Sequence, residues 1–250
     1  MTAYFPDSWE HLVTLLSGSV YLTDLCNTKA EQTLKNQRVF STAKELAEFY
    51  ASGSKYVSPA EEECIRGAVG HLYACYPDLP RVNVYVVVID PQWGLELGRT
   101  SFTLNDIIFL HESAVLNCET IMHETVHVIQ RVFPKWFGWL CNELGYHQWS
   151  NDHRFFQTCQ LVLNPDAEVT YADDSNRFVA YNHNLLPTLV DTTTGDCNVL
   201  DNNSTVNLLG VVVKSDSVSE MVAVRFTEAQ FVDDEALRNH VNQLLSRFTE

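Results

Sequence analysis

Hydrophobic residues recur at helical spacing in the first third of the chain and again at its end. This spacing predicts four helices in the two regions, over about 9–16, 42–50, 59–76 and 234–247. Thr42 and Glu45 fit a capping box at the start of the second helix. Ser58-Pro59 supplies a cap and then a proline at the first helical position of the third helix. The N-terminal part of the chain is therefore expected to be mainly helical.

Strand-like patterns begin after residue 80. Residues 81–90 (RVNVYVVVID) are rich in β-branched side chains and almost continuously apolar, which is typical of a strand buried on both faces. A second short strand is expected over 106–111, and several strands over 178–213 around a polar turn at 201–204. Residues 217–226 fit a helix and a strand equally well.

Two further helices are expected between these strands. One begins at about Asn117 and ends before Pro134, and a loop containing three tryptophans follows it. The other is expected over 152–163. Because neither a repeat nor a linker divides the sequence, we expect a single α+β domain over 1–250, with a helical N-terminal part at 1–80 and a core at 81–250.

Composition and charge argue against several classes of protein. The chain is 46% hydrophobic and 19% charged, as is ordinary for a globular protein. Its 32 Asp and Glu residues outnumber its 16 Lys and Arg residues, which gives a net charge of −16 at pH 7. Such an excess repels phosphate backbones and anionic lipid surfaces, so we expect no nucleic-acid and no membrane partner.

The seven cysteines are scattered along the chain and include no CxxC pair. An odd, unpatterned set predicts reduced, buried thiols and hence a reducing compartment. The N-terminus does not have the pattern of a signal peptide, and no apolar stretch is long enough to cross a membrane. We therefore expect a cytoplasmic or otherwise intracellular protein.

An HExxH motif, His123-Glu124-Thr125-Val126-His127, lies in the helix expected before Pro134. Residues i and i+4 share a helix face, so both imidazoles can bind one ion while Glu124 projects beside them. Zinc binds such nitrogens and lowers the pKa of its bound water to about 7, and a neighbouring carboxylate takes the proton. The motif thus predicts that His123 and His127 bind zinc and that Glu124 is the general base. The alternative is a pair of histidines hydrogen-bonded within a core.

Through this motif, residues 82–226 resemble the zincin metallopeptidases, whose HExxH helix packs beneath a mixed β-sheet. The resemblance implies a zincin-like fold in which residues 106–111 form the edge strand that holds the substrate backbone. The metzincin extension of the motif is absent, because Gln130 and Phe133 stand where that group has Gly and His. A third metal ligand must therefore come from farther along the chain.

Residues 220–226 (EMVAVRF) look like the ExxAxxF segment that supplies the zinc-binding glutamate in some gluzincins, notably the anthrax lethal-factor group. This resemblance implies Glu220 as the third ligand. The alternative is Asp166 in the sequence Asn164-Pro165-Asp166, which resembles the ligand aspartate of aspzincins and an NPD motif of uncharacterised, partly viral HExxH proteins. This short segment also fits a simple turn that caps a helix.

Several other residues remain candidates for the site. Further potential metal ligands are Glu168, His147 and His153, with a loop or capping role as the alternative for the two histidines. Zincins also use a donor that stabilises the developing oxyanion, and the candidates are Tyr171, Tyr181 and His183.

The motif and the resemblance together predict a zinc-dependent peptidase that acts on a peptide or protein substrate, with 81–250 as its catalytic core. Two alternatives stay open at this point. One is a zinc hydrolase that cleaves bonds other than peptide bonds, and the other is a catalytically idle zincin fold used for binding or assembly. The surplus of negative charge favours basic peptides as substrates, with a dependence on salt concentration.

Overall fold

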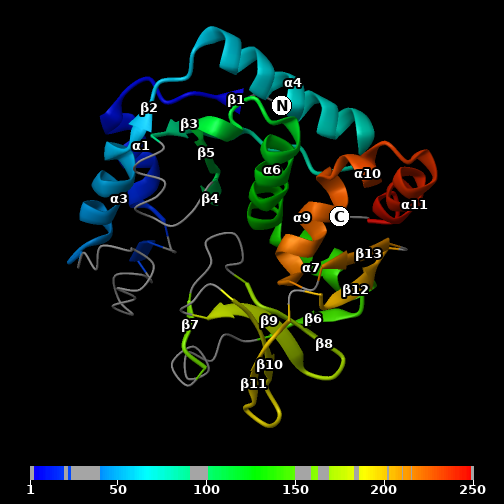
Figure 1. The fold of residues 1–250 in the computed structure, drawn as a ribbon. Coiled ribbons are helices and arrows are strands. Elements are labelled where there is room, and N and C mark those ends of the chain that lie inside the picture. The colour runs from blue at the N-terminus through cyan, green and yellow to red at the C-terminus, as the bar shows by residue number, and fades with distance from the viewer. Residues whose placement is uncertain are drawn as a thin grey trace. The chain divides into compact units, whose positions relative to one another are not determined.

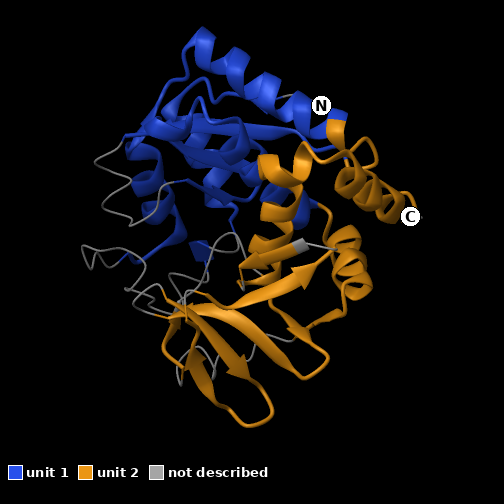
Figure 2. Cartoon of the chain, turned by 45° about the vertical axis from the view of Figure 1, so that its right-hand side comes forward, with its two compact units in different colours: residues 1–74, 81–132 blue, residues 75–80, 133–250 orange. Residues whose placement is uncertain are grey.

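The computed structural model describes residues 3–19, 22–23, 40–90, 101–149, 159–162, 169–182, 186–201, 203–209, 211–214 and 216–248. The chain forms two compact units, one of Met1–Ala74 and Arg81–Val132 and the other of Cys75–Pro80 and Phe133–Glu250 (Figure 2). Each unit combines helices with strands, which confirms the α+β class. The prediction of one domain over 1–250 stays a prediction. Among the described residues, no helix has the length and apolar character needed to cross a membrane.

The helices of the first unit begin close to the predicted residues. They are α1 (Trp9–Ser17), α3 (Ala43–Ser52), α4 (Pro59–Cys75) and α6 (Cys118–Val132), with a 3-10 turn, η2 (Glu112–Ala114), before the last. Thr42 Oγ1 accepts a hydrogen bond from the Glu45 N–H at 3.1 Å, and Ser58 Oγ accepts one from the Glu61 N–H at 3.4 Å. The capping side chains that the sequence indicates are therefore in place.

A mixed sheet forms the centre of the first unit (Figure 1). Its strands are β1 (Ala3–Tyr4), β2 (Ser54–Lys55), β3 (Val84–Ile89), β4 (Phe102–Leu104) and β5 (Ile107–His111). The strand order is β1-β3-β5-β4, and β2 also pairs with β3. β1 and β5 run parallel to β3, whereas β2 is antiparallel to β3 and β4 is antiparallel to β5.

Helices cover both faces of this sheet. Phe102 and Phe109 stack with their ring centroids 4.8 Å apart, and Tyr50 of α3 packs edge-on against both rings. Thr103 points to the opposite face, because successive side chains of a strand alternate. There its hydroxyl accepts a hydrogen bond from Arg131 Nη2 of α6 at 3.1 Å. The sheet thus lies between α3 and α6, which explains why its central strands are apolar on both faces.

The prediction that residues 106–111 form the edge strand is wrong. β5 lies between β3 and β4 and pairs with both. β4 has no counterpart among the predicted strands. It is joined to β5 by the two-residue turn Asn105-Asp106, in which Asn105 has φ +55°. Asparagine tolerates this left-handed conformation better than most residues, so a strand of only three residues can fold back beside β5.

The second unit contains shorter elements. Its helices are α7 (Pro134–Glu143), α9 (Val218–Thr227), α10 (Ala229–Val232) and α11 (Glu235–Leu245). Its strands are β6 (Tyr146–Gln148), β7 (Leu161–Val162), β8 (Tyr171–Asp173), β9 (Arg177–Asn182), β10 (Pro187–Asp191), β11 (Cys197–Val199), β12 (Thr205–Leu208) and β13 (Val211–Lys214). Four of these strands form an antiparallel sheet in the order β11-β10-β9-β7, while β6 pairs with β8 and β12 with β13.

Two predicted elements of this unit differ in the structure. Pro134 follows the end of α6 but is also the first residue of α7, so the expected loop is a helix. Proline suits the first helical position, because the N–H that it lacks would have no partner there. The helix expected over 152–163 is wrong at 161–162, which form strand β7, and residues 151–158 and 163 lie outside the described residues. Residues 217–226, for which helix and strand were both open, form the cap and most of helix α9 (Val218–Thr227).

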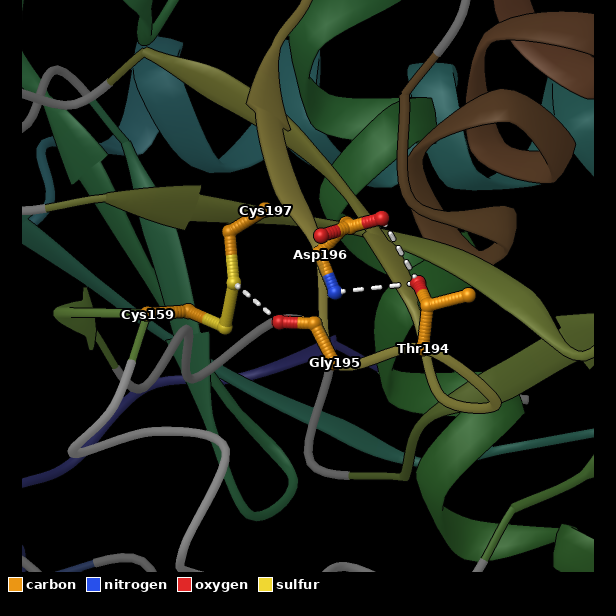
Figure 3. The surroundings of a disulfide bond; sticks show 5 residues. All are labelled: Cys159, Thr194, Gly195, Asp196 and Cys197. Atoms are coloured by element: carbon orange, nitrogen blue, oxygen red, sulfur yellow. Dashed lines mark hydrogen bonds between the residues drawn. A yellow bond between two sulfur atoms is a disulfide. The ribbon is translucent and has the colours of Figure 1, made fainter.

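Cys159 and Cys197 form a disulfide across 38 residues of sequence (Figure 3). The expectation that all cysteines are reduced is therefore wrong for this pair, and the compartment stays a prediction. Gly195, at φ +82°, closes the turn between β10 and β11 and lies just before Cys197, with its carbonyl oxygen 3.5 Å from Cys197 Sγ. Cys159 belongs to a buried apolar cluster with Leu161, Ala172, Phe178 and Val190, and Cys197 packs against it.

Candidate metal centre

His123, Glu124 and His127 lie on α6, the helix that packs against β4 and β5. Asn117 precedes this helix and caps it, because its Oδ1 accepts a hydrogen bond from the Thr120 N–H at 3.1 Å. His127 is 1% exposed and Glu124 is 5% exposed, whereas His123 is half-buried. Polar side chains are rarely buried to this extent without a partner or a function.

The two imidazole rings turn their Nε2 atoms toward each other. These atoms are 3.0 Å apart, and the ring planes meet at 78°. Two nitrogens that bind one tetrahedral zinc ion at about 2.0–2.1 Å are separated by about 3.3 Å. The spacing predicted from the motif is therefore found in the structure, and it suits two ligands of one ion.

Gln130 fixes the orientation of His127 from the other side of the ring. Its Oε1 lies 3.0 Å from His127 Nδ1. An amide oxygen accepts hydrogen bonds, so this contact favours the tautomer with the proton on Nδ1, which leaves the Nε2 lone pair for a metal. This role of Gln130 was not predicted from the sequence. Its signal is the spacing, because residues i and i+3 of a helix share a face.

Glu220 lies in the first turn of α9. Ser217 caps the helix, and its Oγ accepts a hydrogen bond from the Glu220 N–H at 3.3 Å. Ala223 and Phe226, which complete the ExxAxxF pattern, are fully buried, and the Phe226 ring packs 4.9 Å from that of Tyr76. The segment is therefore a helix whose small and aromatic positions face the core of its unit, while Glu220 is half-buried.

Asp216 and Tyr181 support the start of α9. Tyr181 Oη, on β9, donates a hydrogen bond to Asp216 Oδ2 at 2.6 Å, and the Ser217 N–H donates to Asp216 Oδ1 at 2.6 Å. Burial raises the pKa of Asp216 above its usual value, and the nearby Glu220 raises it further, whereas the bond from Tyr181 lowers it. Tyr181 was a candidate oxyanion donor, and in the structure its hydroxyl is bonded to this carboxylate.

Among the described residues, His123, His127 and Glu220 form a group that could hold a metal ion. Each side chain offers one ligand atom, and these atoms all lie within 4.8 Å of one another. Two imidazole nitrogens and one carboxylate oxygen are a donor set that suits zinc, although the same donors bind other divalent transition metals.

The other sequence candidates do not join this group within the described part of the chain. Residues 163–168 lie outside the described residues, and so do His153 and His183; the alternative ligands Asp166 and Glu168 are therefore not placed. His147 is on β6, where it pairs with Ala172 of β8. Tyr171 is buried and packs edge-on against Phe137 of α7. Burial raises the pKa of Tyr171 to about 12.

Comparisons with known proteins give no match. No protein-family model, no curated protein and no solved structure is similar to this chain. The candidate centre and the sequence motifs therefore remain as the indications of a function.

Proposed function

We propose that this protein is a zinc-dependent hydrolase that cleaves peptide bonds, with His123, His127 and Glu220 as its metal ligands. The observation that carries the proposal is the grouping of these three donors on two helices, with Glu124 next to His123 in the sequence. Sequence resemblance to the zincins supports it in two separate segments, the HExxH motif and the ExxAxxF segment.

The donor set has the composition of a catalytic zinc site. Three protein ligands leave one position of a tetrahedral ion open for a water molecule or a substrate, whereas structural sites use four ligands. When bound, zinc acts as a Lewis acid and lowers the pKa of a coordinated water to about 7. The contact with Gln130 favours the His127 tautomer that such a site needs.

Glu124 is the proposed general base. It takes the proton of the attacking water and then passes it to the amine that leaves when the peptide bond breaks. It is adjacent to His123 in the sequence and lies on the same helix, but it is not one of the three grouped donors. Its burial, with 5% of the side chain exposed, keeps bulk water away from this proton transfer.

Metal analysis and three variants test the proposal. We expect about one zinc ion per chain, lost in His123→Ala, because three protein ligands are needed for tight binding. Glu124→Gln should keep the zinc and lose hydrolysis of a peptide library, because the amide keeps the shape of the side chain but cannot take a proton. His147→Ala is the matched control, since this histidine lies outside the ligand group, and it should keep both zinc and activity.

Other outcomes would contradict specific parts of the proposal. A wild-type protein without bound metal would refute the metal centre itself. Turnover of simple esters or amides with no cleavage in the peptide library would favour a non-peptidase hydrolase. A Glu124→Gln variant that keeps full activity would remove Glu124 as the base. Bound zinc with no hydrolysis of any substrate would favour a protein that only binds or assembles.

A further inference from the structure

The disulfide joins elements at opposite edges of the four-stranded sheet in the second unit. Cys159 lies two residues before the first residue of β7, and Cys197 is the first residue of β11. The strand order is β11-β10-β9-β7, so β10 and β9 separate the two linked strands. The Cα atoms of the two cysteines are 5.8 Å apart, so the chain just before β7 lies next to the start of β11 (Figure 3).

Strand β7 is the element that depends most on this bond. It has only two residues, and it pairs with β9 at Leu161↔Asn182 and Val162↔Tyr181. Two residue pairs at a sheet edge are a weak attachment, because isolated short strand pairs are marginally stable in water. The disulfide ties the chain covalently just before β7, and thereby holds β7 against the part of β9 that contains Tyr181.

Tyr181 connects the four-stranded sheet to α9 through a series of hydrogen bonds. Its hydroxyl donates to Asp216 Oδ2 at 2.6 Å, and Asp216 Oδ1 accepts from the Ser217 N–H at 2.6 Å. Ser217 Oγ in turn accepts from the Glu220 N–H at 3.3 Å. Hydrogen bonds to a carboxylate are shorter and stronger than neutral ones, so a shift of Tyr181 moves the start of the helix that carries Glu220.

We propose that the Cys159–Cys197 disulfide is a redox switch that controls metal affinity at the proposed centre, and that Tyr181 and Asp216 are the positioning residues through which it acts. In the oxidised protein β7 is held, Tyr181 is fixed and Glu220 is positioned as a ligand. In the reduced protein β7 loses its covalent tie, and the position of Glu220 is less well defined. This inference rests on the proposed metal-binding function.

A dithiol is the reductant that the chemistry requires. Cys197 is more exposed than Cys159, which is 8% exposed, so a dithiol thiolate attacks Cys197 Sγ and the bond to Cys159 Sγ breaks. Cys159 leaves as a thiolate and takes up a proton. The second thiolate of the reductant then attacks its own mixed-disulfide sulfur and releases Cys197 as a thiolate, which is protonated in turn. Two electrons and two protons pass from the dithiol to the protein, and the reductant becomes a disulfide.

The test compares zinc affinity in the two redox states. Oxidised protein and protein reduced with a dithiol, both freed of reductant under anaerobic conditions, are titrated against a chromophoric zinc chelator. We expect about tenfold weaker zinc binding in the reduced state, in line with the effect of losing an outer-shell contact. A thiol assay on denatured protein confirms the states, since reduction of this disulfide adds two thiols to the chain.

Three variants test whether the disulfide acts on Glu220 through Tyr181 and Asp216. Cys159→Ser should bind zinc weakly whether or not dithiol is added, whereas Cys64→Ser, which changes a free cysteine, should keep the full difference between the two states. Tyr181→Phe removes only the hydroxyl and should bind zinc weakly in both states. Cobalt-substituted Tyr181→Phe should show a changed visible spectrum, because the ligand geometry changes, while its thermal unfolding shows that the fold is kept.

The outcomes separate the switch from the metal centre. Equal zinc affinity of the oxidised and reduced wild type would overturn the switch and leave the proposed centre standing. If the oxidised and reduced forms of Tyr181→Phe or of Glu220→Ala still differ in zinc affinity as much as those of the wild type, the action through Tyr181 and Glu220 is refuted. Absence of zinc binding in both states would instead refute the proposed function. If Cys159→Ser fails to fold, the wild-type comparison still decides.

Discussion

At the scale of single residues, Gln130 has a role that its chemistry makes specific. It is 6% exposed, and its amide oxygen faces the buried ring of His127. A carboxylate at this position would also accept the hydrogen bond, but it would add a negative charge to the proposed centre, which already includes the carboxylates of Glu124 and Glu220. The neutral amide sets the tautomer of His127 without adding charge to the centre.

Replacement of Gln130 tests this role. We expect Gln130→Leu, which has a similar size and no acceptor, to lower zinc affinity about 10–100-fold, because His127 loses the contact that fixes its ring and tautomer. Gln130→Glu keeps an acceptor and should bind zinc at close to wild-type affinity. Competition with a chromophoric chelator measures both variants. A Gln130→Leu variant with unchanged zinc affinity would contradict the positioning role.

Helical spacing was enough to predict that His123 and His127 share a face, and it also locates Gln130. The comparison of position 130 with the glycine that metzincins have there does not indicate a contact with His127. Tyr181 and Asp216 are a different case, because they lie 35 residues apart and come from a strand and a helix start. No spacing rule connects such positions, so only the folded chain shows that they meet.

At the scale of elements, α9 shows how a helix start can place a ligand. Residues 217–220 have the S-x-x-E pattern of a capping box, in which the glutamate side chain accepts the N–H of the capping residue. Here the Ser217 N–H donates to Asp216 Oδ1 instead. The carboxylate that accepts the Ser217 N–H is therefore that of Asp216. Glu220 occupies a first-turn position, where the helix dipole favours a negative charge.

Loss of the cap should weaken this helix by a predictable amount. Ser217→Ala removes the acceptor of the Glu220 N–H and should lower the free energy of unfolding by about 1 kcal/mol. Ser217→Asp keeps an acceptor and should unfold close to the wild type. Urea denaturation of the two variants measures the difference. Identical urea midpoints for wild type and Ser217→Ala would show that the cap contributes nothing.

Elements with long periodic patterns and clear caps were predicted well, as α1, α3, α4 and α6 show. Short elements whose conformation depends on pairing or packing with another element were not predicted. β4 has three residues, and its strand conformation comes from pairing with β5 across the turn at Asn105. α7 was missed because a proline can end one helix and begin the next, and only the packing of Trp136 and Phe137 in the core decides between the two.

At the scale of the whole molecule, the two units rely on different devices for stability. The first unit buries a mixed sheet between helices, as its apolar strands predict. The second unit has shorter strands and adds a disulfide, which constrains the unfolded chain by an amount on the order of 3–4 kcal/mol for a loop of this length. The pairing could not be predicted, because seven cysteines allow many combinations and spacing alone does not select one.

Buried tyrosines make both units sensitive to alkaline pH. Burial raises the pKa of Tyr73 in the first unit to about 12, and those of Tyr76 and Tyr171 in the second unit to about 12 as well. Tyrosines of the unfolded chain lose their protons near pH 10. Above this pH the unfolded state binds fewer protons than the folded state, so the free energy of unfolding falls as pH rises toward 12.

Each of these tyrosines should contribute about 2–3 kcal/mol to that fall, because the pKa shift is about two units, and none of it should be seen below about pH 10. Urea denaturation at a series of alkaline pH values measures the slope, and the ultraviolet absorbance of phenolate reports ionisation. Tyr171→Phe keeps the ring that packs on Phe137 but has no group to ionise, so its slope should be smaller by one of the three contributions. A Tyr171→Phe slope equal to that of the wild type would mean that this hydroxyl ionises without unfolding, and would contradict its burial in the second unit.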